Sequence, residues 1–177
     1  MRKTILTFGL IAGLLAGVPL FAIAVLYRGA PPENGMLIGT LIMLVALSLV
    51  FVAIKRRRDA ELGGVIRFWP ALGLGLAISV VAGLVYAAAW EVTLAVTQLD
   101  FGTEYAKAYL AQGQAKGLSE AELAKLAAEM EDFKAMYAKP LYRFGITLSE
   151  ILPVGLLVSL VSAALLRNPR FMPARRS

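Results

Sequence analysis

Four apolar segments limit most strongly what this chain can fold into. They cover residues 5–27, 36–54, 68–92 and 144–166. Each has about the 20 residues that an α-helix needs to cross the hydrocarbon core of a bilayer. In that environment every backbone N–H and C=O group must be paired within the protein, and a helix does this within one segment. The pattern predicts an all-α, integral membrane protein in which residues 1–177 form a single membrane domain, a four-helix transmembrane bundle.

The composition restricts the chemistry that such a bundle can perform. The chain of 177 residues is 59% hydrophobic and contains neither cysteine nor histidine. Cysteine supplies thiolate nucleophiles and metal ligands, and histidine is the commonest metal ligand and acid–base group at neutral pH. The four segments also lack aspartate. We therefore expect no enzyme, no catalytic residues, no metal site and no cofactor.

The basic residues predict the orientation of the bundle, because Lys and Arg near the ends of spans are retained in the cytoplasm. One side carries 11 of the 18 basic residues and two acidic ones, a net charge of +9, and the other carries seven basic and ten acidic residues, a net charge of −3. Both termini are expected in the cytoplasm, and the basic side should contact anionic lipid headgroups rather than nucleic acid. The basic residues of that side are Arg2, Lys3, Lys55, Arg56, Arg57, Arg58, Arg67, Arg167, Arg170, Arg175 and Arg176.

The first segment has two interpretations. The stretch MRKTILTFGLIAGLLAGVPLFAIA has the basic start, apolar core and small-residue end of a cleaved secretory signal. We favour a retained span, since the apolar stretch continues to Tyr27 and is long enough to cross a bilayer. The next residues, RGAPPENG at 28–35, predict a polar turn. Pro19 and Pro153 lie inside spans, where proline kinks a helix.

Small residues in two of the spans predict close helix contacts. Glycines at four-residue steps in the first span lie on nearly one face of a helix, which lets a second helix approach closely. Packing within one chain and dimerisation both explain such a face, and three other spans are available for the former. The glycines are Gly9, Gly13 and Gly17 in the first span and Gly73, Gly75 and Gly83 in the third.

Residues 93–139, between the third and fourth spans, form the one sizeable segment outside the predicted bundle, and we expect an extracytoplasmic helical hairpin there. Ser119 and Glu122 have the spacing of a capping box, so a helix should start at Ser119. Its apolar residues recur at intervals of three and four and form one stripe, and a shorter helix is expected at residues 103–112. The hairpin could bury these stripes against itself, lie on the membrane surface or bind a partner.

Three stretches resemble a known family. They are GGVIRFWPALGLGLAISVVAGLVY at 63–86, AAEMEDFKAMYAKPLY at 127–142 and TLSEILPVGLLVSLVSAALLRNPRF at 147–171. Together they resemble the bacterial membrane proteins catalogued as domain of unknown function 4199. The resemblance covers nearly the whole chain and implies a four-helix protein of the inner membrane with a helical outer insertion. It implies no activity.

One carboxylate inside the predicted bundle marks the candidate site. Glu91 should be hydrated at the outer interface, whereas Glu150 lies deeper and must have a partner, water or a proton there. As a proton or cation site, Glu150 would act with the carbonyls freed by Pro153. As a structural clamp, it would bond to Thr40 or Tyr86, or through water to Arg143. The polar site comprises Glu150, Thr147, Ser149, Arg143 and Glu91.

Two classes of function remain open. The first is a structural or accessory membrane protein that binds a partner through its outer hairpin, either a second copy of the chain or another membrane protein. The alternative is a small proton- or cation-coupled transporter or channel centred on Glu150. The small size and the absence of an obvious internal repeat favour the first class.

Overall fold

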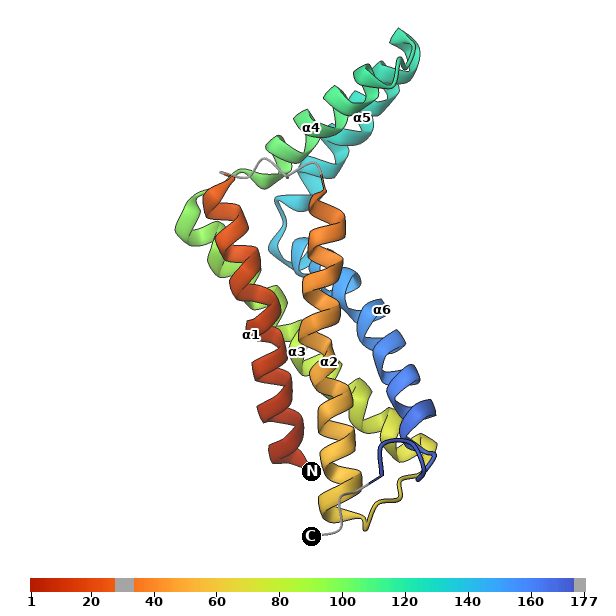
Figure 1. Cartoon of the computed structure of the whole chain (residues 1–177). Helices are drawn as coiled ribbons and strands as arrows, with labels where there is room; N and C mark the ends of the chain where they lie inside the picture. The colour runs from red at the N-terminus through yellow and green to blue at the C-terminus, as the bar shows by residue number, and fades with distance from the viewer. Residues whose placement is uncertain (28–33, 174–177) are drawn as a thin grey trace.

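The computed structural model describes residues 1–27 and 34–173, and these residues form six helices and no strand (Figure 1). Four of the helices are long and apolar enough to cross a membrane, namely α1, α2, α3 and α6. The all-helical fold with four candidate spans agrees with the prediction. The bounds are α1 Arg2–Leu26, α2 Gly35–Glu61, α3 Phe68–Thr97, α4 Phe101–Ala115, α5 Glu120–Tyr137 and α6 Pro140–Leu166.

The helices extend beyond the predicted spans at their polar ends. α3 continues to Thr97, and α6 begins at Pro140, four residues before the expected start. Hydropathy marks only the part of a helix that suits hydrocarbon, whereas helical hydrogen bonding continues into the polar region. Proline is well placed at the start of α6, where its missing N–H would have no helical partner. Most of the turn predicted at 28–35 lies outside the described residues.

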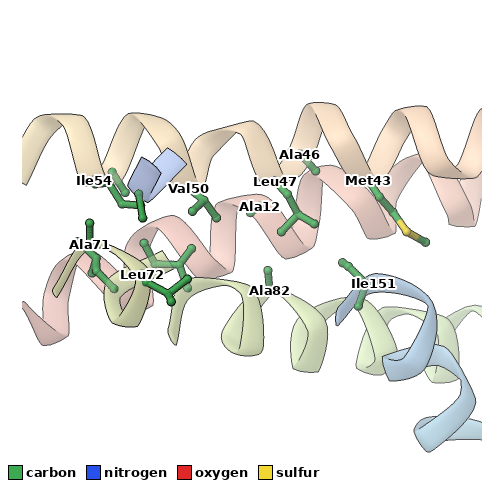
Figure 2. Packing of buried hydrophobic residues seen from close by; sticks show 14 of the residues in the cluster. Ala12, Met43, Ala46, Leu47, Val50, Ile54, Ala71, Leu72, Ala82 and Ile151 are labelled. Atoms are coloured by element: carbon green, nitrogen blue, oxygen red, sulfur yellow. The ribbon is translucent and has the colours of Figure 1, made fainter. Parts of the chain in front are cut away.

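α3 is the central helix of the bundle. Its most extensive contacts are with α1 on one side and α6 on the other, and α2 packs on α1, α3 and α6. The buried residues that all four helices contribute meet in one core, which Figure 2 shows from close by. The labelled residues of this core are Ala12 of α1, Met43, Ala46, Leu47, Val50 and Ile54 of α2, Ala71, Leu72 and Ala82 of α3, and Ile151 of α6.

The glycines of α1 all face α3. A Cβ atom built on Gly9 would lie 2.6 Å from Val81 Cβ, and one on Gly13 would lie 2.5 Å from Val85 Cβ. A Cβ on Gly17 would lie 2.7 Å from Ala89 Cβ. Real Cβ atoms do not approach this closely, so each glycine makes room for the facing helix. Within one chain, α3 therefore occupies the surface that could also have served a dimer.

The glycines of α3 differ from one another. A Cβ on Gly75 would meet Ser159 Oγ of α6 at 2.8 Å, and one on Gly83 would meet Leu148 Cδ2 at 3.2 Å. Gly73 does not mark a helix contact as we had expected, because a Cβ there would have no atom within 4 Å. The expectation was wrong because residues 73 and 75 lie about 200° apart around a helix, so the two cannot share one face.

Arg58 fixes the C-terminal end of α2 to the chain after α6. The side chain is fully buried, and its guanidinium donates to the carbonyls of Phe171 at 2.9 Å and Met172 at 2.6 Å. It also donates to the Asp59 carboxylate at 2.7 Å. The sequence had placed this arginine among the exposed basic residues. It is instead a buried structural group whose guanidinium binds carbonyls of the chain after α6.

α4 and α5 pack on each other and run away from the four long helices (Figure 1); we call residues 101–137 the arm. Ser119 caps α5, and the reciprocal bonds of a capping box with Glu122 are present, as predicted. Near the tip, a Cβ on Gly113 would lie 3.1 Å from Leu126 Cδ2, and near the base the rings of Tyr105 and Phe133 are 5.2 Å apart. The arm thus packs its apolar stripes on each other, and most of their side chains are partly buried.

The contrast between two glycines gives a direct test of the central contact. We expect Gly13→Ala to lower the free energy of unfolding by about 1–3 kcal/mol, because its Cβ would overlap Val85 and the Ala82 carbonyl. Gly73→Ala adds the same methyl group in open space, so its effect should stay within about 0.5 kcal/mol. Unfolding in mixed micelles measures both variants. Equal losses would contradict the close approach of α1 and α3.

Candidate functional site

The base of the arm is fixed to the bundle by an ion pair between α3 and α6. Arg143 donates from Nε and Nη2 to the two carboxylate oxygens of Glu91, at 2.7 and 2.5 Å. A third bond runs from its guanidinium to the Tyr137 carbonyl at 3.3 Å, at the end of α5. The sequence predicts a hydrated Glu91 at the interface and offers Arg143, through water, as one of three clamp partners for Glu150. The two bind each other because they face across neighbouring helices, whereas Arg143 and Glu150 are about 10 Å apart along one helix.

Aromatic rings form a second connection beside this ion pair. Trp90 Nε1 donates to the Tyr137 hydroxyl at 2.7 Å, and both side chains are buried. Ring contacts continue from Trp90 to Phe101 at 5.1 Å, from Phe101 to Tyr105 at 5.7 Å and from Phe133 to Tyr137 at 5.3 Å. We call these five residues the aromatic cluster. It packs the start of α4 and the end of α5 against α3.

Tyr137 stays protonated in this environment. Burial raises the pKa of its phenol to about 12, although the hydrogen bond from Trp90 acts in the opposite direction. The hydroxyl therefore accepts from Trp90 and keeps its own proton at neutral pH. It can still act as a hydrogen-bond donor at the base of the arm.

A cavity of about 190 Å³ lies between the arm and the long helices. The aromatic cluster forms much of its wall, and Tyr86, Thr147 and Glu150 contribute its other polar groups. Glu150 retains an exposed side chain there, while Tyr86 is buried. Leu20 of α1 and Ile146 of α6 complete the lining. The sequence-predicted acid thus lies at the junction of the arm with α1, α3 and α6.

The polar residues predicted around Glu150 are only partly brought together. Thr147 lines the same cavity, but its hydroxyl donates to the Arg143 carbonyl at 3.0 Å. Ser149 is exposed and donates to the Ile146 carbonyl at 2.7 Å, outside the cavity lining. The Thr40 hydroxyl donates to Met36 within α2 at 2.9 Å and makes no clamp. Of the proposed clamp partners, Tyr86 alone shares the cavity, close enough to interact with Glu150.

The Glu150 carboxylate has no cationic partner in the described part of the chain, since none of the ion pairs there includes it. The proline three residues later has no N–H, so the Ser149 carbonyl lacks its usual helical donor. A carboxylate in such surroundings can accept a proton or a cation. The described residues contain no group of three or more side chains that could together hold a metal ion.

A second, larger cavity of about 400 Å³ shares Phe101 and Tyr137 with the first. Its charged groups already have partners: Arg143 binds Glu91, Lys134 binds Glu131 at 3.0 Å, and Asp100 accepts from Thr103. Hydrogen bonds from Thr103 hold the pKa of the Asp100 carboxyl below its usual range. We therefore place the candidate site in the smaller cavity, where a charge has no partner.

The aromatic cluster was not predicted from the sequence. The helices predicted at residues 103–112 and from Ser119 contain Tyr105, Phe133 and Tyr137, but their patterns do not indicate that these rings meet Trp90. The available signal was the concentration of aromatic residues between 86 and 142. Their meeting point depends on how α4, α5 and α3 pack, and a local pattern does not contain this information.

Four helices long and apolar enough to cross a membrane indicate a helical membrane protein. The model of the family described as "Protein of unknown function (DUF4199)" matches residues 7–168, so the chain belongs to this family. No curated protein and no solved structure matches the chain. The family membership confirms the resemblance in the sequence and assigns no activity.

The ion pair at the arm base can be tested by removing its cation. We expect Arg143→Gln to destabilise the fold by about 1–3 kcal/mol, because Glu91 would lose both charge-assisted hydrogen bonds. Lys139→Gln, at an exposed position one turn earlier, should cost less than about 0.5 kcal/mol. Thermal unfolding in detergent measures each variant. Adding Glu91→Gln to Arg143→Gln should restore part of the loss, and a purely additive double variant would contradict the pairing.

Proposed function

We propose that the chain is a multi-pass protein of the bacterial inner membrane with both termini in the cytoplasm and the arm outside. The distribution of basic residues supports this orientation. In the structure, the start of α1 and the end of α6 lie at one end of the bundle and the arm lies at the other (Figure 1). Arg28, Arg175 and Arg176 lie outside the described residues.

We further propose that the inner end contacts anionic lipid headgroups. Exposed arginines gather there on several elements, and phosphate groups of a bilayer surface would compensate their charge. Nucleic acid is not proposed as a partner, because retention of basic residues in the cytoplasm during membrane insertion already accounts for their position. The exposed arginines are Arg2, Arg56, Arg67, Arg167 and Arg170.

The proposed role is that of an accessory membrane protein, not an enzyme, whose arm binds a protein partner. The observation that carries this proposal is that the arm is packed within itself and fixed to the bundle by two sets of contacts. A segment whose apolar stripes already pack on each other depends less on the membrane surface to fold. The face of α5 turned away from α4 is exposed and carries charges of both signs, as at Lys125 and Glu129. Such a fixed, polar projection suits contact with another protein.

Single cysteines provide the test, since the chain contains none of its own. Spheroplasts carrying Glu129→Cys are treated with an impermeant maleimide that bears a photoactivatable group. We expect the maleimide to label this cysteine and, on illumination, to crosslink the chain to its partner in one discrete adduct. Arg56→Cys, at the inner end, should stay unloaded until the membrane is permeabilised.

The mass of the adduct identifies the partner as a second copy or another protein. If the partner is another protein, excess unlabelled chain must suppress the adduct, which separates specific binding from random collision. Loading of Arg56→Cys in intact spheroplasts would overturn the orientation. Absence of a discrete adduct from Glu129→Cys, Lys125→Cys and Asp132→Cys would overturn partner binding by the arm.

A second candidate function is the passage of protons or small cations at Glu150, favoured by the cavity that reaches this carboxylate. In liposomes, the chain should then raise proton or potassium flux above that of empty vesicles. Glu150→Gln should reduce this flux at least about tenfold, the loss expected for one essential site worth about 1.4 kcal/mol. Glu129→Gln changes the same charge on the exposed arm and should leave flux unaltered. Flux equal to that of empty vesicles would show the transport candidate to be wrong.

A further inference from the structure

We propose that the cavity between the arm and the long helices binds an organic monocation with an alkylated ammonium group, with Glu150 as its counter-ion and the aromatic cluster as its wall. This site does not depend on a partner for the arm or on passage of ions. Four features of the structure support it, namely charge, wall chemistry, volume and closure.

The first feature is a carboxyl group without a cationic partner among the described residues. The nearest candidate cation in the sequence of α6, Arg143, is held by both carboxylate oxygens of Glu91. No ion pair of the described residues includes Glu150. Tyr86 and Thr147 contribute hydroxyl groups to the same lining. A ligand with one positive charge would complete this site.

The second feature is the chemistry of the wall. Tyr86 and the five residues of the aromatic cluster line the cavity together. The faces of such rings attract cations, and several rings around one site form the cage that recognises alkylated ammonium groups. Divalent metal ions need about six oxygen ligands, and Glu150 is the one carboxylate in this lining. The walls therefore favour an organic ammonium group over a metal ion.

The third feature is size. A cavity of about 150 Å³ is large enough for a benzene-sized guest, and this one has about 190 Å³. A trimethylammonium group falls in this range. The same chemistry occurs in free choline-like molecules and in the headgroups of choline lipids, and the cavity lies at the outer end of the spans where either could enter.

The fourth feature is closure of the cavity on its inner side. Below Glu150, α6 packs tightly on α3, where a Cβ on Gly155 would lie 2.6 Å from Ser79 Cβ. Ile151 is fully buried one residue after the acid. A ligand entering from the arm side would therefore stop at Glu150.

Tryptophan fluorescence reports binding, because Trp90 belongs to the cavity wall. The chain has two tryptophans, so Trp69→Phe leaves Trp90 as the only emitter. This variant is purified in lipid-free detergent and titrated with choline and with its uncharged isostere, in which carbon replaces nitrogen. We expect choline to change the emission with saturation and to bind at least about tenfold more tightly than the isostere, as a Coulombic contribution to binding requires.

Two variants locate the site. Glu150→Gln should weaken choline binding at least about tenfold, and Tyr105→Leu about three- to thirtyfold, the range for loss of one cation–π contact. Glu129→Gln makes the same change of charge as Glu150→Gln on the exposed face of the arm and should bind choline normally. Thermal unfolding confirms that each variant is folded. The comparison of choline with its isostere needs no variant and so remains decisive if Glu150→Gln does not fold.

Three results would overturn the proposal. They are equal binding of choline and the isostere, unchanged binding of choline by folded Glu150→Gln, and a saturable response to magnesium that displaces choline.

Nanodiscs then distinguish the source of the ligand. If phosphatidylcholine added to phosphatidylglycerol nanodiscs competes with choline, the headgroup enters the site, and otherwise the free cation is the ligand. Choline binding without proton or potassium flux would support this inference and show the transport candidate to be wrong. Flux without choline binding would support the transport candidate and overturn this inference.

Discussion

The close approach of neighbouring helices to α3 is the contact on which the rest of the structure depends. Lipid tails are as apolar as the side chains of these helices, so van der Waals packing between close backbones must supply much of the association. α1 uses Gly9, Gly13 and Gly17 for this approach, and α6 meets α3 at Gly75 and Gly83. In the most apolar part of α3, 56% of the residues are buried, against 28–33% in the other candidate spans. α3 therefore sets the positions of both partners.

A fixed α3 provides a fixed base for the arm. Trp90 and Glu91 are consecutive residues near its outer end, and they hold Tyr137 and Arg143 on either side of the junction between α5 and α6. α3 then continues to Thr97, after which the left-handed conformation of Gln98 redirects the chain toward α4. The arm is thus joined to the bundle at both of its ends. Movement at its base would have to break a buried hydrogen bond, an ion pair and several ring contacts together.

The sequence predicts the local parts of this arrangement well. Apolar length identified four candidate spans, and the pattern around Ser119 located the start of α5, because both depend on neighbouring residues. The partners of the charged residues could not be predicted in this way. Arg143 and Glu91 are 52 positions apart, and Arg58 binds a carbonyl 113 positions later. Such pairs depend on which faces of the helices meet. For the same reason, the spacing of glycines in α3 did not show that Gly73 lies away from the neighbouring helices.

The cavity at Glu150 lies between a close helix contact and the aromatic cluster. On the side away from the arm, Gly155 and Ser79 allow α6 and α3 to touch. On the arm side, the rings of the aromatic cluster line the cavity, and the hydrogen bond from Trp90 to Tyr137 ties the arm to α3. A carboxylate in such a cavity is less favourable than an apolar residue. Departures of this kind from a well-packed interior are expected where a ligand supplies the missing interaction.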